Sequence, residues 1–123
     1  MSQHIGVDII EIARIKKACS RWGDTFLTRV FTSGELSLYR NKMSSLAARF
    51  AAKEAVLKAL GDCDSGISWQ DIEVLSERDG KPRISLRGKA EKVAIGLAIN
   101  DLKISLSHSK DYALAFVVGS SQN

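Results

Sequence analysis

The sequence predicts one domain that combines α-helices with β-strands, because its apolar residues follow two different periods along the chain. The segments in which apolar and polar residues alternate, as in half-buried strands, are 5–9, 72–74, 84–86 and 102–106. The segments with the period of amphipathic helices are 11–22, 46–60 and 90–97. The chain has 123 residues, 45% of them hydrophobic, which suffices for one modest core. We therefore expect a single domain over residues 1–123.

The first element is a short strand in which Ile5, Val7 and Ile9 alternate with Gly6 and Asp8. Side chains of a strand point alternately to its two faces, so Asp8 lies on the face opposite the three aliphatic residues. The pattern therefore predicts a carboxylate that need not lie on the surface.

A helix over residues 11–22 follows, and one side of it is cationic. Arg14, Lys17 and Arg21, which we name the basic ridge, lie on nearly the opposite arc from the apolar residues of the helix. A solvated helix face is the ordinary explanation of such a row. A positively charged docking surface is the alternative.

Gly23 is expected to end this helix, and a short apolar segment at 26–31 leads to the next one. The sequence TSGE at 32–35 has the spacing of a capping box, in which the first and fourth residues satisfy each other's backbone N–H groups. We expect the second helix to run through about Tyr39.

The most informative helix covers residues 49–61, RFAAKEAVLKALG, and is apolar on two sides. Its leucines and Phe50 form one stripe, while its alanines form a flatter face that another element can approach closely. Such a helix is expected to be buried, and its charged side chains to be largely shielded from water. It nevertheless carries one carboxylate and three cations, which are Glu54, Arg49, Lys53 and Lys58.

The sequence of the helix alone allows two explanations of these charges. Glu54 and Lys58 can form an ion pair one turn apart on a partly solvated edge, worth about 0.3–0.5 kcal/mol. The further cations Arg49 and Lys53 instead favour a bound anion. Together with a carboxylate that can hold a metal ion, they point to the polyphosphate of a nucleotide-like ligand, since Mg²⁺ is held by one or two carboxylates plus substrate phosphates.

The second half of the chain is predicted to be richer in strands. Gly61 is well placed to end the long helix, and residues 61–68 are expected to form a loop. The turn dipeptide Asp79-Gly80 separates two strand-like segments, which predicts a hairpin whose second strand starts near Pro82. The elements expected after the hairpin are a helix at 90–97 and strands at 102–106 and 112–118.

The turn between the last two strands has the sequence SHSKD at 107–111 and contains His108 and Ser109. A solvated polar loop is the simpler explanation, because loops collect polar residues. An imidazole, two hydroxyls and backbone N–H groups are also suited to an anion, so a phosphate-contacting turn is the alternative. The position of the turn in the fold decides between them.

Composition limits the partners and the compartment. The chain has 18 basic and 14 acidic residues, a net charge of +4 and a pI near 9.2, which favours nucleic acid, an acidic protein or a phosphorylated small molecule as partner. Cys19 and Cys63 are isolated and lack metal-ligand spacing, so neither a zinc site nor a disulfide framework is indicated. The sequence shows no signal peptide and no membrane-spanning run, and we expect a cytoplasmic protein without a membrane partner.

Three segments together resemble a known family. They are GVDIIEIARI at 6–15, RFAAKEAVLKALG at 49–61 and ISLSHSKDYALAFVV at 104–118, with GKP at 80–82 between them. Their order and spacing are similar to those of the holo-acyl-carrier-protein synthases, the small bacterial class of 4′-phosphopantetheinyl transferases. The resemblance implies an α+β fold of helices packed on an antiparallel sheet, assembled as a homotrimer with active sites at the subunit interfaces.

The resemblance also implies a reaction. Members of this family transfer the phosphopantetheine arm of coenzyme A to a serine hydroxyl of an apo acyl carrier protein and release adenosine 3′,5′-bisphosphate. Asp8 and Glu54 match the metal-binding carboxylates of the family, which implies Mg²⁺. Lys58 matches a lysine at the phosphates, and Asp8, directly or through a water, is the candidate base for the serine.

The other matching positions are expected to contact the coenzyme or the carrier protein. The residues expected to bind the coenzyme are Arg49, Lys53, Lys58, Gly61, Pro82, His108 and Ser109. Among them, Arg49 and Lys53 are expected at the phosphates, and Pro82, in the GKP turn, at the adenine. The basic ridge is expected to bind the carrier protein, because acyl carrier proteins present an acidic helix.

One departure and one alternative remain at this point. Family members often carry a GTG-type turn after the long helix, whereas Gly61 is followed here by DCDSG at 62–66, so the contacts of this loop with the coenzyme are left open. The basic pI also allows a non-catalytic module that binds RNA or coenzyme A. An RNP-type aromatic motif and a GXXG loop are missing, and we expect no nucleic-acid partner.

Overall fold

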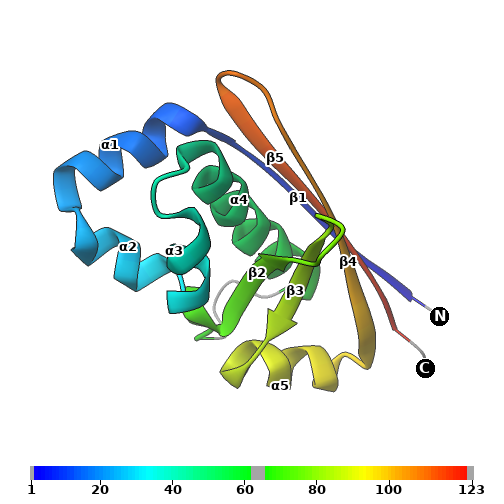
Figure 1. Ribbon diagram of the computed structural model, residues 1–123. Helices are drawn as coiled ribbons and strands as arrows, with labels where there is room; N and C mark the ends of the chain where they lie inside the picture. Colours follow the sequence, from blue (N-terminus) through cyan, green and yellow to red (C-terminus); the bar gives the residue numbers. More distant parts are fainter. Residues whose placement is uncertain (1, 62–65, 122–123) are drawn as a thin grey trace.

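The computed structural model describes residues 2–61 and 66–121 and shows the expected α+β fold. The elements in chain order are β1 (Ser2–Glu11), α1 (Ile12–Trp22), α2 (Asp24–Val30), α3 (Ser33–Tyr39), α4 (Met43–Leu60), the 3₁₀ turn η1 (Trp69–Asp71), β2 (Ile72–Ser76), β3 (Pro82–Leu86), α5 (Gly88–Gly96), β4 (Ile99–His108) and β5 (Tyr112–Ser121). Figure 1 shows α4 between the long strands and the group of α1, α2 and α3.

The long strands form an antiparallel sheet with the order β1-β5-β4. Because β5 lies in the centre, Phe116 pairs with Val7 on one side and with Ser105 on the other. The hairpin expected around the Asp79-Gly80 turn is confirmed as a second sheet, in which β2 and β3 pair antiparallel. The expected antiparallel pairing is therefore present in both sheets.

The helix α4 packs on β1 so closely that one strand position has room only for glycine. A Cβ atom at Gly6 would lie 1.8 Å from the carbonyl oxygen of Ala55. Ala51 and Ala55 are fully buried, so the flat alanine face predicted from the sequence does meet another element. Asp8 shares the face of β1 with Gly6, and this close packing places its carboxylate beside α4.

The expected helices begin and end close to the expected residues, with one extension, and the apolar segment expected at 26–31 lies largely in a further helix, α2. α4 starts at Met43, ahead of the first residue that its apolar period indicated, and Gly61 ends it with a left-handed φ of 76°. The capping box of Thr32 and Glu35 is present at the start of α3. No helix within residues 2–61 and 66–121 has the length and hydropathy needed to cross a bilayer.

The face of the long sheet that points away from α4 is apolar and open. Ile5, Val7 and Ile9 of β1 are 57%, 45% and 60% exposed. Leu114 and Phe116 of β5 pair with this strand and are also exposed. A contiguous apolar patch of this kind indicates an interaction surface. The aliphatic side of β1 is thus its outer side, and Asp8 is on the inner one.

Candidate active site

Two carboxylates and a lysine come together where β1 meets the second half of α4. Lys58 Nζ lies 3.1 Å from Asp8 Oδ1 and donates a hydrogen bond to the carbonyl oxygen of Val7 at 3.0 Å. Glu54 lies one helical turn before Lys58 and close enough to Asp8 for the Asp8 charge to shift its pKa. The structure therefore brings together the three residues that were expected to be catalytic.

The electrostatics of this cluster favour a cation. Burial raises the pKa of the Glu54 carboxyl, the charge of Asp8 raises it further, and Lys58 acts in the opposite direction. Both leading causes disfavour a second negative charge at this place. A bound cation would relieve both of them, because it stabilises the two carboxylates in their ionised forms.

Lys58 differs from the expectation that it is largely shielded from water. Its side chain is 51% exposed, because β1 is an edge strand and leaves the last turn of α4 open to solvent. Among the described residues its ion pair is with Asp8 and not with Glu54. The ammonium group is therefore anchored at one side and accessible at the other.

Asp8 and Glu54 fit Mg²⁺ if a ligand completes its coordination. Among residues 2–61 and 66–121, no group of three or more His, Cys, Asp or Glu side chains could hold a metal ion. Two carboxylates nevertheless provide hard oxygen donors, and Mg²⁺ commonly takes its other ligands from water and substrate phosphates. The pair is thus suited to a metal ion that binds together with a phosphorylated substrate.

Gly61 follows Lys58 at the C-terminus of α4. Its N–H group donates to the carbonyl oxygens of Leu57 and Lys58, both at 3.1 Å, which confirms its expected role as the end of the helix. Its contact with the coenzyme stays a prediction. Residues 62–65, where the sequence departs from the glycine turn of the family, lie outside the described residues.

Lys53 is not available to a phosphate, which corrects the expectation for this residue. Its side chain is fully buried, and Nζ lies 2.9 Å from Glu35 Oε1. Nζ also donates to the carbonyl oxygens of Trp69, at 3.1 Å, and Ile72. An ammonium group has three N–H donors, and these acceptors use all of them. The anion that Lys53 requires is therefore a carboxylate of the protein itself.

Arg49 lies on the first half of α4 and is also buried, but its guanidinium group has a different environment. Nε donates to the carbonyl oxygen of Val74 at 3.2 Å, and Nη2 donates to Tyr39 Oη at 2.9 Å and to Ser76 Oγ at 3.0 Å. Burial lowers the pKa of Arg49, while the nearby Tyr39 and Glu35 raise it. The guanidinium group keeps its charge in the protein, because arginine is not deprotonated at ordinary pH.

Arg49 lines a cavity of about 390 Å³ that also brings Pro82 and His108 together. These three residues, all expected to bind the coenzyme, come from α4, β3 and the end of β4. The other polar side chains at the cavity are Tyr39, Ser44, Ser45, Ser76 and Ser107. Ser107 belongs to the turn that the sequence offered as a phosphate contact, whereas the tyrosine and the other three serines have no distinctive spacing, so no sequence signal identified them.

Ser109, the neighbour of His108, is not among the residues that line this cavity. Its Oγ accepts hydrogen bonds from the backbone N–H groups of Asp111, at 3.4 Å, and Tyr112, at 3.2 Å. Ser109 therefore shapes the turn between β4 and β5. Its expected contact with the coenzyme stays a prediction, and Ser107 is the serine of this turn that lines the cavity.

The carboxylates and the cavity are separate in one chain. Asp8, Glu54 and Lys58 do not line the cavity, although Glu54 and Arg49 share α4. Five residues along an α-helix rotate the side-chain direction by about 140°, so Arg49 and Glu54 point to different sides. A ligand that touches both groups within one chain would have to pass around α4.

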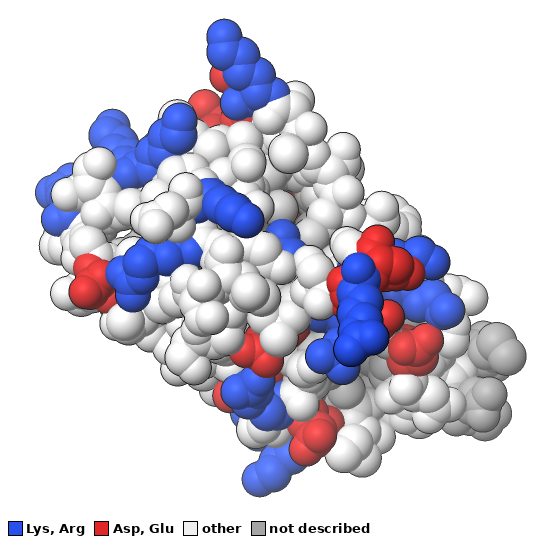
Figure 2. Space-filling view, viewed as in Figure 1, with Lys and Arg blue, Asp and Glu red and all other residues white. Residues whose placement is uncertain are grey.

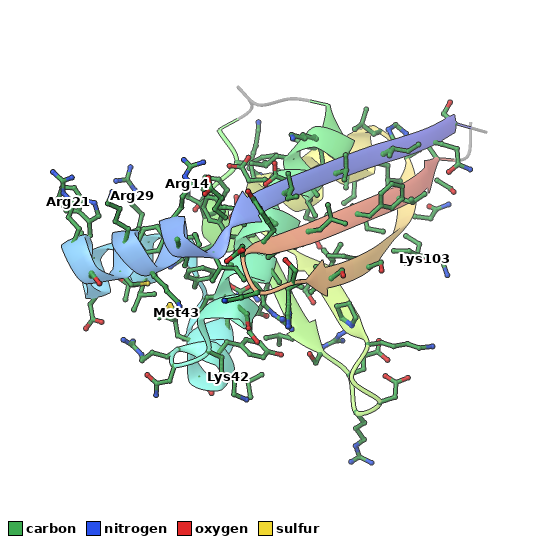
Figure 3. The ribbon with its side chains drawn as sticks, turned by 90° about the horizontal axis from the view of Figure 1, so that it is seen from above. Arg14, Arg21, Arg29, Lys42, Met43 and Lys103 are labelled. Carbon is green, nitrogen blue, oxygen red and sulfur yellow. The ribbon has the colours of Figure 1, made fainter. Side chains whose placement is uncertain are left out.

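The basic ridge is exposed on α1, as expected. Figure 3 shows Arg14 and Arg21 on the same side of the molecule, together with Arg29 of α2, and Figure 2 shows positive charge gathered over this end of the protein. Arg14, Lys17 and Arg21 are all exposed. The ridge is thus free to meet an acidic partner.

Comparison with known proteins identifies relatives along nearly the whole chain. The family model described as the 4′-phosphopantetheinyl transferase superfamily matches residues 4–117. A holo-acyl-carrier-protein synthase from Dehalococcoides mccartyi is 52% identical over 115 residues, which are 94% of this chain and 96% of the relative. The enzyme of the same name from Herpetosiphon aurantiacus is 50% identical and matches over 93% of this chain and 95% of its own.

Solved structures with the same fold carry the same name. The holo-acyl-carrier-protein synthase of Helicobacter pylori in complex with coenzyme A has a TM-score of 0.85 and 37% identity, with 94% of this chain and 99% of that chain covered. The synthase of Neisseria meningitidis has a TM-score of 0.88 and 33% identity, with 96% and 98% covered.

Proposed function

Because the chain belongs to the holo-acyl-carrier-protein synthases of the 4′-phosphopantetheinyl transferase superfamily, we propose roles in that reaction for its own residues. The enzyme transfers the 4′-phosphopantetheine moiety of coenzyme A to a serine hydroxyl of apo acyl carrier protein and releases adenosine 3′,5′-bisphosphate. The observation that carries the assignment of residues is the contact of Lys58 with Asp8 beside Glu54.

The chemistry is an in-line transfer at phosphorus. The serine oxygen attacks the phosphorus atom that bears the pantetheine arm, and the bond from this atom to the bridging pyrophosphate oxygen breaks. The serine proton passes to Asp8, directly or through a water, and the leaving bisphosphate keeps the electron pair of the broken bond. Lys58 stabilises the negative charge on that leaving group. Mg²⁺ held by Asp8 and Glu54 would neutralise charge on the phosphoryl oxygens.

The cavity on the other side of α4 receives the nucleotide half of coenzyme A. Arg49 and His108 supply donors for phosphate oxygens, and Pro82 offers an apolar contact for the adenine. The complex of the Helicobacter pylori relative with coenzyme A supports this class of ligand.

The transfer can be tested directly by mass spectrometry. Apo acyl carrier protein incubated with this protein, coenzyme A and Mg²⁺ should gain the mass of one phosphopantetheine group. Omission of coenzyme A should abolish the gain, and chelation of Mg²⁺ should reduce it. A protein that binds coenzyme A but modifies none of a panel of carrier proteins would instead be a non-catalytic binding module.

A homotrimer would complete the active site. The carboxylates and the nucleotide cavity point to different sides of one chain, and the outer face of the long sheet is apolar and open. If copies pack through this face, the carboxylates of one copy can meet the cavity of its neighbour. One interface between copies would then explain why the carboxylates and the cavity lie apart in one chain and why the outer face of the sheet is apolar and exposed.

Subunit complementation tests this arrangement. Asp8→Asn and Arg49→Met are each expected to be inactive, but a refolded equal mixture should regain activity. Random mixing leaves about a quarter of shared sites with both groups intact. The control is a mixture of Asp8→Asn with Glu54→Gln, whose defects lie in the same half of the site, and it should stay inactive. Failure of the first mixture to exceed the control would place each site within one chain.

The basic ridge is the proposed docking surface for the carrier protein. Reversal of charge at Arg14 and Arg21 to glutamate should raise the KM for the carrier protein at least about tenfold, because complementary charge accelerates and orients the encounter. The affinity for coenzyme A should stay unchanged in calorimetry. The double variant Lys89→Glu with Lys92→Glu, two exposed residues of α5, provides the control for the same change in net charge. If the two variants weaken coenzyme binding more than carrier binding, the ridge is not the docking surface.

A further inference from the structure

The guanidinium group of Arg49 is held so that only one of its nitrogens is left for a ligand. A guanidinium has five N–H donors, of which one is on Nε and two are on each terminal nitrogen. Val74 accepts from Nε, and the hydroxyls of Tyr39 and Ser76 accept from Nη2. Nη1 has no hydrogen-bond partner among residues 2–61 and 66–121.

The free nitrogen can be placed by elimination. Within the described residues every fully buried side-chain nitrogen or oxygen has a hydrogen-bond partner. Nη1 has none, so it is not fully buried, and Arg49 lines the cavity shared with His108 and Pro82. Nη1 is therefore the nitrogen of Arg49 that is left for a ligand in this cavity, where the proposed function places the nucleotide half of coenzyme A.

Tyr39 and Ser76 hold the Arg49 guanidinium group in its orientation. Tyr39 lies at the end of α3 and is 9% exposed, while Ser76 lies at the end of β2. The two hydroxyls are 2.8 Å apart and bond each other, and the centroid of the Tyr39 ring lies 3.9 Å from Arg49 Cζ. The ring thus packs on the guanidinium group while its hydroxyl and Ser76 bond Nη2.

We propose that Tyr39 and Ser76 are positioning residues for coenzyme recognition, because they fix the Arg49 guanidinium and aim its Nη1 donors at a phosphate of the nucleotide. This inference rests on the proposed function, which places that nucleotide in the cavity. Tyr39 and Ser76 need not touch the ligand. Because they already order the long Arg49 side chain, this side chain loses little conformational freedom when the ligand binds.

Calorimetry with adenosine 3′,5′-bisphosphate on the full chain tests the proposal. Tyr39→Phe keeps the ring and removes the hydroxyl, and it should raise the Kd about fivefold. Ser76→Ala should also raise the Kd. In an Arg49→Met background, neither substitution should change the Kd further, because the residue that they position is absent. Tyr112→Phe, which removes the hydroxyl of the only other tyrosine in the sequence, should leave the Kd unchanged.

Three results would contradict the proposal, and they can be told apart. An unchanged Kd in both Tyr39→Phe and Ser76→Ala overturns the proposal, even if the melting temperature falls. An equal loss of affinity with and without Arg49 also overturns it, because the hydroxyls would then act through the fold in general. Absence of bisphosphate binding in the wild-type chain would overturn the proposed function itself, and this inference with it, before any variant is compared.

Discussion

Asp8→Asn is expected to slow phosphopantetheine transfer by about 10³-fold, which corresponds to about 4 kcal/mol of lost transition-state stabilisation. The substitution removes one of two carboxylates proposed to hold Mg²⁺ and also the proposed acceptor of the serine proton. Asparagine retains the size of the side chain, so its packing beside α4 should persist. Initial rates are measured by mass spectrometry of the carrier protein, and circular dichroism checks the fold.

The Mg²⁺ dependence of the residual rate separates the two roles of Asp8. If it acts mainly as a metal ligand, the variant should need more Mg²⁺ and recover part of its rate at high concentration. If it acts mainly as the base, the rate should stay low at saturating Mg²⁺. Glu91→Gln is the control, because it changes an exposed carboxylate on α5, away from the proposed site and interface, and should retain the wild-type rate. A rate for Asp8→Asn within twofold of wild type would remove the residue from the reaction.

Glu54→Gln is expected to be equally inactive but slightly more stable without metal. Burial and the charge of Asp8 raise the pKa of Glu54 in the folded protein. A raised pKa means that this group favours the folded state below its unfolded pKa and loses that contribution as the pH rises through its folded pKa. At neutral pH the ionised carboxylate therefore costs stability, which glutamine does not. The melting temperature should rise without Mg²⁺, and Mg²⁺ with coenzyme A should stabilise the variant less than wild type.

The sequence predicts the faces of β1 but not which of them is the outer one. Alternation correctly separates Asp8 from Ile5, Val7 and Ile9. In an isolated domain the aliphatic face would be the buried one, yet here the inner face carries Gly6 and Asp8 against the alanines of α4. The choice depends on how closely α4 approaches β1 and on whether the opposite face of the sheet can stay open. Neither property can be read from the period of a single strand.

Partners that are distant in the sequence explain the error at Lys53. The capping-box pattern correctly identifies Glu35 as the partner of Thr32, and its Oε1 accepts from the Thr32 N–H group at 2.9 Å. The same oxygen also lies 2.9 Å from Lys53 Nζ, while Oε2 accepts from the Val74 N–H group at 2.7 Å. One carboxylate thus joins α3, α4 and β2. A local pattern shows the first of these contacts, and only the packing of the elements shows the other two.

Lys53→Met should therefore reduce the stability of the protein and not its affinity for the coenzyme. Methionine fills a similar volume, but Glu35 is then left fully buried without its cation. Removal of one partner of a buried ion pair costs about 3–5 kcal/mol, because the remaining charge is uncompensated. Urea unfolding at a fixed protein concentration measures the loss, and the Kd for coenzyme A should change less than about twofold in the folded variant.

The double variant Lys53→Met with Glu35→Gln isolates the charge. Glutamine keeps one acceptor oxygen, which can serve the N–H group of either Thr32 or Val74, and it removes the unpaired negative charge. The double variant should consequently be more stable than Lys53→Met alone, which is a coupling that a double-mutant cycle measures. If Lys53 contacted a phosphate of the coenzyme instead, Lys53→Met would raise the Kd about tenfold or more with little change in unfolding, and Glu35→Gln would not compensate.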